Sequence, residues 1–205
     1  MLPKDIFHKH HRIGIDIDET LAESVMDGLA KLHLQNKMQV IQDFCQITSF
    51  DWTDILGCDM TADELVYFWR MHSLHWVFPM SDAIDGVAQL SWQDKYIHVI
   101  TARNEHDHRS DTEKWLNLYF PEIHPSNVHF ANHLSSHNHA KSTICKSLDV
   151  TLMIDDGLHN ALDLAENNIE CILLDKPWNR KVEANHPLIH RVQHWQEIID
   201  NLNSK

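Results

Sequence analysis

The sequence is poor in glycine, in closely spaced cysteines and in long apolar runs, and each shortage excludes a class of protein. Five glycines in 205 residues argue against long flexible linkers and favour a helix-rich chain. No apolar run approaches the roughly 18 to 20 residues of a membrane-spanning helix, and no secretion signal is recognisable at the N-terminus. Because no Cys-x-x-Cys spacing occurs, we expect a cytoplasmic protein with four free thiols: Cys45, Cys58, Cys145 and Cys171.

Basic residues are also scarce, since 17 Lys and Arg stand against 30 Asp and Glu. The formal net charge of −13 disfavours binding to nucleic-acid polymers or anionic membranes through a general field. Any phosphate must therefore be bound locally. The 18 histidines lack a close spacing with cysteine partners, so we interpret them as surface residues with a pH-dependent charge rather than as a zinc site. Metal storage by the histidines is a more distant alternative.

The apolar pattern predicts one α/β domain with an insertion. Residues 13–17 read as a buried strand, and residues 21–37 carry apolar side chains at helical spacing. From residue 81 onward short apolar runs alternate with helical patterns, and parallel strands need such helical crossovers. We therefore expect a three-layer, Rossmann-like parallel sheet. The later elements are expected as strands at 96–100, 128–130, 151–154 and 171–174, and as helices at 82–92, 111–120, 138–148, 158–167 and within 186–205.

The region before residue 81 is irregular and rich in aromatic residues. Thr61-Ala-Asp-Glu64 matches a capping box and predicts a helix through about Ser73. We expect residues 22–80 to form a small helical cap, inserted after the first strand of an α/β core made of residues 1–21 and 81–205. The aromatics favour a hydrophobic core within the cap, although three of them could instead stack on a ligand: Trp69, Trp76 and Phe78.

Polar side chains follow three of the predicted strands. Asp16 and Asp18 come at the end of the first strand, and residues two apart on a strand point to the same side. An isolated Asp-x-Asp occurs as readily in a solvent-exposed turn as in a functional site, so the rest of the sequence must distinguish the two. Thr101-Ala-Arg-Asn104 follows the second strand with groups suited to phosphate oxygens, although Thr is also common in turns. Because ligands bind beyond the carboxyl ends of parallel strands, these groups are candidates for one site.

A further pair of acids, Asp155 and Asp156, ends the strand at 151–154, and no ordinary turn requires both. Lys141, near the start of a predicted helix, could reach the same edge of the sheet, with Lys146 as a rival. Four carboxylates in one cleft repel one another unless a cation compensates. Ligation by oxygen alone favours Mg²⁺ over zinc. Acids for a metal with Thr and Lys for an anion predict a phosphoryl-transfer site, in which an aspartate can be the nucleophile.

These motifs resemble those of a known superfamily. The chain is similar to the haloacid dehalogenase superfamily of phosphohydrolases in the order and spacing of Asp16-x-Asp18-x-Thr20, Thr101, Lys141 and Asp155-Asp156. The stretches 141–156 and Leu174-Asp-Lys-Pro-Trp-Asn-Arg180, with the short helical insertion, resemble the 5′(3′)-deoxyribonucleotidases and related bacterial nucleotidases. The resemblance implies an α/β hydrolase with a cap, and Mg²⁺ as the cofactor.

The resemblance also implies a division of roles. Asp16 would attack phosphorus and form an aspartyl-phosphate while binding Mg²⁺. Asp18 would protonate the leaving oxygen, then activate water, and lend its backbone carbonyl to the metal. Glu19 stands where glycine is common in nucleotidases, which leaves the substrate open.

The remaining motif residues would bind the substrate phosphate and the metal. Thr101 and Lys141 would hold the phosphoryl oxygens. Either of the adjacent acids could take the direct metal position, and the resemblance assigns Asp156 to it, with Asp155 behind it to orient Lys141. Arg103 has no role in the motifs and is equally well a loop arginine.

The favoured function is a Mg²⁺-dependent phosphomonoesterase acting on nucleoside monophosphates, with the cap covering the substrate. A phosphatase for another small metabolite, such as a sugar phosphate, is the alternative, because one core serves many substrates. A non-catalytic nucleotide-binding module is the third possibility, and the presence of both Asp16 and Asp18 argues against it.

Overall fold

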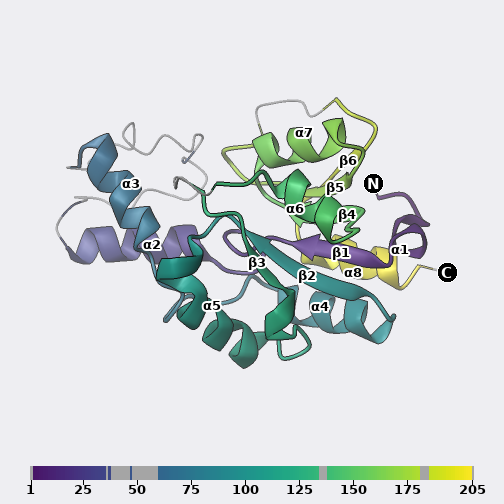
Figure 1. Ribbon diagram of the computed structural model, residues 1–205, viewed down its shortest axis with the longest axis horizontal. Helices are drawn as coiled ribbons and strands as arrows, with labels where there is room; N and C mark the ends of the chain where they lie inside the picture. The colour runs from purple at the N-terminus through teal and green to yellow at the C-terminus, as the bar shows by residue number, and fades with distance from the viewer. Residues whose placement is uncertain are drawn as a thin grey trace.

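The structure is a computed structural model that describes residues 2–35, 37, 47, 60–133, 138–180 and 185–204. Its elements in chain order (Figure 1) are α1 (Ile6–Lys9), β1 (Arg12–Ile15), α2 (Ser24–Leu34), α3 (Ala62–Arg70), α4 (Ala83–Trp92), β2 (Tyr96–Thr101), α5 (Glu105–Tyr119), the 3₁₀ helix η3 (Pro125–Asn127), β3 (Val128–Phe130), α6 (Lys141–Ser147), β4 (Leu152–Asp155), α7 (Leu158–Glu166), β5 (Glu170–Leu174), β6 (Ile189–Val192) and α8 (Trp195–Leu202).

Within the described ranges the strands form one parallel sheet in the order β3-β2-β1-β4-β5-β6. Ile13 of the central strand β1 pairs with Ile97 of β2 on one side and with Leu152 of β4 on the other. The chain builds β2 and β3 on one side of β1, then crosses back to build β4, β5 and β6 on the other. Ligands in such sheets bind beyond the carboxyl ends of the strands at this change of direction. The predicted Rossmann-like α/β fold is confirmed.

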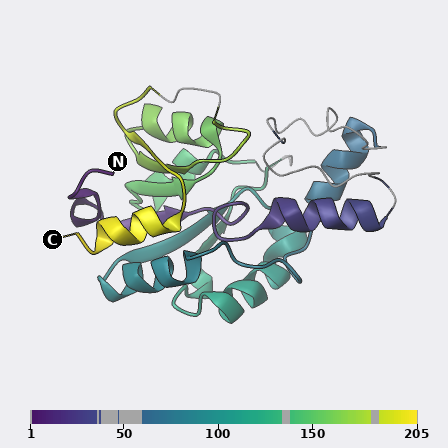
Figure 2. The same cartoon turned by 180° about the vertical axis from the view of Figure 1, so that it is seen from behind.

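Helices cover both faces of the sheet. Successive strand side chains point to opposite faces, so on β4 Leu152 and Ile154 enter one apolar core while Met153 enters the other. The larger core lies under α1, α4, α5 and α8, and the smaller one under α6 and α7. Figures 1 and 2 show these helices as two layers with the sheet between them, and both chain termini at the same end. The predicted three-layer arrangement is therefore present.

The predicted cap contains α2 and α3, which lie together away from the two helical layers (Figures 1 and 2). Their shared apolar cluster also includes Trp178, which follows β5. Gly28 of α2 allows the close approach of α3, because a Cβ atom at this position would lie 2.2 Å from the Trp69 ring. Leu74 and Val77, from the end of the predicted cap, are buried in the larger core of the sheet. The division at residues 22–80 stays a prediction.

The capping box at Thr61 is confirmed. The Thr61 hydroxyl accepts a hydrogen bond from the Glu64 N–H, and the Glu64 carboxylate accepts one from the Thr61 N–H. The helix predicted at 111–120 begins earlier, at Glu105, because the Asn104 side chain caps it by accepting from the Asp107 N–H. The first two turns of α5 are polar, so the helical spacing of apolar residues could not predict them.

The C-terminal tail differs from the single helix that was predicted within residues 186–205. Residues 189–192 instead form strand β6, which pairs with β5 before α8 begins at Trp195. A strand of four residues is too short for its own pattern to separate it from a helix. Helix α1 was not predicted, and α6 begins at Lys141 rather than at residue 138. Three of the aromatic residues in the predicted cap, Phe44, Phe50 and Trp52, lie outside the described residues.

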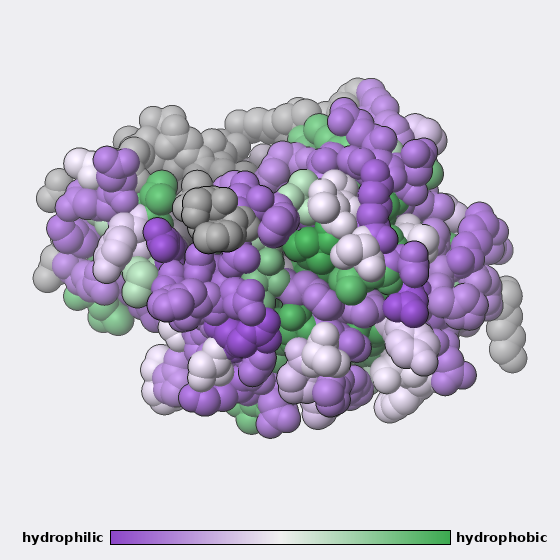
Figure 3. Space-filling view, in the orientation of Figure 1, coloured by the Kyte–Doolittle hydropathy of each residue, from purple (hydrophilic) through white to green (hydrophobic). Residues whose placement is uncertain are grey.

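The visible surface is mainly polar. Most of the face in Figure 3 is hydrophilic, and hydrophobic atoms show mainly between the helical layers, where Figure 1 has the sheet. None of the helices in the described ranges has the length and apolar character needed to cross a bilayer. Cys145 and Cys171, the two cysteines in those ranges, are buried free thiols.

Candidate active site

The carboxyl ends of β1, β2 and β4 bring the predicted site residues to one edge of the sheet. Asp16 directly follows β1, and its N–H continues the pairing with β4 by donating to the Ile154 carbonyl over 3.0 Å. Thr101 is the last residue of β2, and Asp155 is the last of β4. Lys141 is the first residue of α6. Because β1 lies between β2 and β4, these groups converge.

Three acids and one lysine form the centre of the site. Carboxylate oxygens of Asp16, Asp155 and Asp156 all lie within 4.8 Å of one another, and all three residues are buried. The Lys141 ammonium lies 2.8 Å from Asp16 Oδ1 and 2.8 Å from Asp155 Oδ2. One positive charge therefore faces three carboxylates, and a divalent cation would balance the group.

Hydrogen bonds distinguish the two adjacent acids. The Asp155 carboxylate accepts from Lys141 Nζ, from the Gly157 N–H over 2.7 Å and from Asn160 Nδ2 over 3.1 Å. Asp156 accepts on Oδ2 from the Trp178 indole N–H over 2.9 Å. The Asp155 oxygens are thus engaged in holding Lys141 and the start of α7.

The pKa values reflect this crowding of negative charge. Burial, followed by the proximity of Asp155 and Asp18, raises the pKa of Asp16 to about 7 despite the opposing charge of Lys141. Burial and then the charges of Asp155 and Asp16 raise the pKa of Asp156 well above its usual value. Burial lowers the pKa of Lys141, but Asp155 and Asp16 outweigh it, so the pKa of Lys141 is raised. The pKa values of Asp16 and Asp156 are raised because the site gathers more carboxyl groups than cations, which is the condition under which a bound cation would stabilise their ionised forms.

Asp18 lies beside this group but in a different environment. Arg103 donates from Nε to Asp18 Oδ2 over 3.0 Å and from an Nη to Oδ1 over 2.6 Å. The Ser24 hydroxyl donates to Oδ1 over 2.5 Å. Burial raises the pKa of Asp18, but the Arg103 charge and these hydrogen bonds outweigh it and hold the pKa at about 2. In the substrate-free protein Asp18 is therefore a carboxylate.

Glu19, which departs from the glycine common in nucleotidases, occupies a backbone conformation that favours glycine. Its φ is 56°, in the left-handed region. The buried carboxylate accepts from the Val25 N–H over 2.7 Å and from Lys176 Nζ over 3.1 Å. The ion pair with Lys176 offsets the cost of burying this charge at the base of the cap.

The two rival lysines are separated by the structure. Lys141 is buried between two acids of the site, whereas Lys146 is exposed at the other end of α6 and donates to Asn167 Oδ1. Thr101 is fully buried, and its hydroxyl accepts from the Arg103 N–H over 3.2 Å. Lys141 is therefore the lysine that the fold brings to the acids.

A cleft of about 710 Å³ opens over these residues. The cap contributes Leu65 and Trp69 to its wall, and the core contributes four histidines at positions 108, 133, 139 and 159. Trp76 and Phe78 are not among the lining residues and are 73% and 70% exposed. Of the three aromatics considered for substrate stacking, the described structure brings only Trp69 to the cleft.

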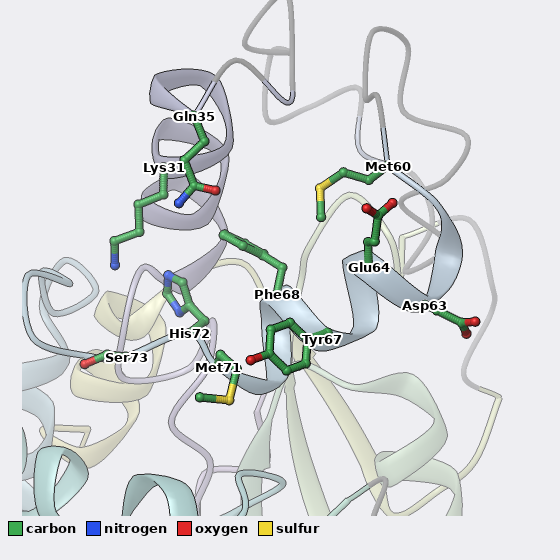
Figure 4. Close-up of a pocket in the computed structure, with 10 residues that line it drawn as sticks. All are labelled: Lys31, Gln35, Met60, Asp63, Glu64, Tyr67, Phe68, Met71, His72 and Ser73. Atoms are coloured by element: carbon green, nitrogen blue, oxygen red, sulfur yellow. The ribbon is translucent and has the colours of Figure 1, made fainter.

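A second pocket of about 680 Å³ lies between α2 and α3 (Figure 4). Lys31 of α2 and Phe68 and His72 from the α3 side line it together with other cap residues. It contains none of the strand-end acids, so the candidate active site is the first cleft.

Sequence reasoning missed several contacts of the site. The sequence patterns indicate no role for Arg103, Ser24 or Asn160, and they include Trp178 only within the stretch 174–180. The position of Arg103, two residues after the strand-end Thr101, was the signal that could have identified it as a residue of the site. The contacts of Ser24 and Trp178 depend on how the cap and the loop after β5 fold back, and no local pattern encodes that.

Solved structures of other proteins share this fold. CbbY from Rhodobacter sphaeroides, solved in complex with phosphate, superposes with a TM-score of 0.58, 15% identity and coverage of 94% of this chain and 99% of that one. A haloacid dehalogenase-like hydrolase from Bacteroides fragilis superposes with a TM-score of 0.64 and 14% identity, covering 92% and 99% of the two chains. The fold is that of the haloacid dehalogenase-like hydrolases.

Sequence comparison narrows this class. The model of the family described as "5′ nucleotidase, deoxy (Pyrimidine), cytosolic type C protein" matches residues 10–205, and the chain belongs to this family. The chain is 28% identical over 197 residues to a 5′(3′)-deoxyribonucleotidase of Bacillus subtilis, with 91% of this chain and 95% of the relative covered. A 5′(3′)-deoxyribonucleotidase of Bacillus phage SPbeta matches with the same identity and coverage. The protein is a phosphoric monoester hydrolase of the nucleotidase type.

Proposed function

We propose that the protein is a Mg²⁺-dependent phosphomonoesterase that hydrolyses nucleoside monophosphates through an aspartyl-phosphate on Asp16. The observation that carries this proposal is the buried group of Asp16, Asp155, Asp156 and Lys141 at the strand ends, with Asp18 beside it. The nucleotide substrate is supported by the family and by the relative from Bacillus subtilis. The cytoplasmic location stays a prediction.

The reaction would proceed in two balanced steps. An Asp16 oxygen attacks phosphorus, the ester P–O bond breaks, and the leaving oxygen takes a proton from Asp18. Water then attacks the phosphorus of the aspartyl-phosphate, Asp18 takes a proton from it, and phosphate leaves while the Asp16 carboxylate is restored. For the first step Asp18 must take a proton from solvent or from the substrate monoanion, and the negative charge of the arriving phosphate favours that by raising the pKa of Asp18. The second step returns a proton from water to Asp18.

The remaining residues would bind and orient. Asp16 and Asp156 would hold the cation with the Asp18 carbonyl, and a bound Mg²⁺ would neutralise the charge of the phosphoryl oxygens. Lys141 and Thr101 would bind those oxygens, and Asp155 would keep Lys141 in place through the 2.8 Å contact. Trp69 would cover the substrate from the cap side of the cleft.

The test is phosphate release from a panel of nucleoside 5′- and 3′-monophosphates, in ribo and deoxy forms, and of sugar phosphates. We expect turnover of nucleotides with Mg²⁺ and none with EDTA. Turnover of sugar phosphates alone would contradict the nucleotide substrate and leave the enzyme class in place. No turnover of any ester would favour a non-catalytic module.

The Trp178 indole provides a prediction about the metal. Trp178→Phe keeps an aromatic ring in the cap cluster but removes the N–H that orients Asp156. Loss of such a supporting hydrogen bond weakens metal binding by about 10- to 100-fold, so we expect a loss of this size in Mg²⁺ affinity measured by calorimetry. Trp92→Phe, which changes an exposed residue of α4, is the control. Equal affinities in both variants would contradict the role of Trp178.

The raised pKa of Asp16 predicts how metal binding depends on pH. Without metal, this pKa of about 7 means that Asp16 is mostly protonated at pH 6 and ionised at pH 8. Because a cation must displace the proton at the lower pH, and because the pKa of the second proposed ligand, Asp156, is also raised, Mg²⁺ affinity should be at least about tenfold weaker there. The rise in melting temperature on adding Mg²⁺ should therefore be larger at pH 8, with KCl at equal ionic strength as the control. An equal or larger rise at pH 6 would count against Asp16 as a ligand.

A further inference from the structure

Arg103 joins Asp18 to the cap. Two of its nitrogens donate to the two Asp18 oxygens, and another Nη donates to the His72 carbonyl over 2.7 Å. The Arg103 side chain is only 7% exposed. One buried guanidinium therefore contacts both the proposed acid and base and the backbone that leads out of α3.

We call residues 70–74, which lead from α3 back toward the sheet, the return segment. Side chains at the start of α5 bind its backbone at two more points. His108 Nε2 contacts the Arg70 carbonyl, and the Leu74 N–H donates to Asp111 Oδ2 over 3.2 Å. Arg103, His108 and Asp111 thus hold the return segment at three alternate residues.

The other connection between core and cap also reaches Asp18. Ser24, the first residue of α2, donates its hydroxyl to Asp18 Oδ1. The two connections run beside each other, since the Glu23 N–H donates to the Phe78 carbonyl over 2.9 Å and the Met80 N–H to the Leu21 carbonyl over 2.7 Å. Both connections between core and cap therefore reach Asp18. Ser24 binds it directly, and the return segment is linked to it through Arg103.

We propose that Arg103 is a positioning residue that makes the orientation of Asp18 depend on the docking of the return segment. The proposal rests on the proposed function for the role of Asp18 as acid and base. A guanidinium suits this task because its planar fork holds a carboxylate at two points and still has an N–H for a carbonyl. A lysine would keep the charge but not these three fixed directions. With Arg103 in place, Asp18 is oriented only when the cap is seated.

The first test compares two esters that differ in their need for an acid. A nucleotide leaves as a poor alkoxide and requires a proton from Asp18, whereas 4-nitrophenyl phosphate leaves as a stable phenolate. For Arg103→Ala we expect kcat/KM to fall about 100-fold with the nucleotide and no more than about fivefold with the nitrophenyl ester. Arg103→Lys should restore less than a tenth of the lost activity. Arg109→Ala, which removes an arginine paired with Glu105 and Glu113, is the matched control.

The second test needs no activity. Backbone amide exchange over residues 70–74 reports how firmly the return segment is held. We expect Arg103→Ala to speed exchange by about tenfold, and Asp18→Ala to speed it as well because Arg103 loses its anchor. In a double-mutant cycle, Asp18→Ala should add nothing once Arg103 is alanine. Arg109→Ala should match the wild type.

The two tests separate this inference from the proposed function. If the wild type hydrolyses neither ester, the proposed function fails, and the exchange cycle alone then decides the link through Arg103. Equal losses with both esters in Arg103→Ala would overturn the positioning of Asp18. Exchange unchanged by Asp18→Ala, or changes that multiply in the double variant, would overturn the link to the return segment.

Discussion

Replacing Asp16 with asparagine is expected to lower turnover by at least roughly 10⁴-fold, because an amide cannot form the aspartyl-phosphate. The substitution keeps the size of the side chain, and the backbone N–H of residue 16 still pairs with Ile154. Phosphate release measures the loss. Wild-type enzyme quenched in acid should carry a hydroxylamine-sensitive phosphate on residue 16 that the variant lacks.

The same variant should be more stable than the wild type without metal. Folding raises the Asp16 pKa from 3.8 to about 7, so the ionised carboxylate destabilises the fold. This cost is absent below about pH 4, grows as the pH rises, and is complete above about pH 7. We expect Asp16→Asn to gain about 4 kcal/mol in denaturant unfolding at pH 8 and nothing near pH 4.

Asp85→Asn, an exposed acid on α4, is the control for both measurements. It should change neither turnover nor stability by a measurable amount. Full activity in Asp16→Asn would refute covalent catalysis by this residue. A loss of stability at pH 8 would show that its charge is compensated by other groups.

Lys141→Met is expected to be the most destabilising substitution of the site. It keeps the length of the side chain but removes the cation between Asp16 and Asp155. Removing one partner of a buried pair typically costs about 3 to 5 kcal/mol, because the other charge stays buried. We expect a loss of this size in metal-free protein at pH 8, and a smaller one at pH 6, where Asp16 takes up a proton. Turnover should fall at least about 100-fold as phosphate binding is lost.

Lys146→Met provides the matched control on the same helix. Lys146 is exposed and donates to Asn167, far from the acids of the site, so its loss should cost less than about 1 kcal/mol and leave turnover unchanged. If the two lysine variants lost equal stability, Lys141 would not be the compensating charge. Mg²⁺ should restore more stability to Lys141→Met than to the wild type, since the cation replaces the missing positive charge.

The central part of the fold was predictable because its signals are local. Buried parallel strands appear as short apolar runs, and β1, β2, β4 and β5 all lie within one or two residues of their predicted positions. Asp16, Thr101 and Asp155 follow those runs directly, so their meeting at one edge follows from the parallel order of the strands. The order and spacing of these motifs were also enough for the family resemblance, which the comparisons confirm.

The parts that were missed depend on partners distant in sequence. Strand β6 exists because β5 offers an unpaired edge, and its own four residues carry too short a pattern. The first turns of α5 have a polar sequence, yet the side chains of His108 and Asp111 bind the backbone of the return segment. Contacts of this kind require two chain segments to be placed together first, so a single-sequence pattern contains no trace of them.

The sequence by itself determined that Asp16 and Asp18 would share one edge of the sheet with Asp155 and Asp156, since these acids follow parallel strands. It left the lysine open between Lys141 and Lys146. Only the tertiary structure decided how the two acids differ. Asp16 is buried among like charges, which raises its pKa, while Asp18 meets Arg103 and Ser24, which lower its pKa. The positions of the charged residues along the chain determine which of them reach the same edge of the sheet. Burial and hydrogen bonds from distant segments determine whether each of these groups is protonated.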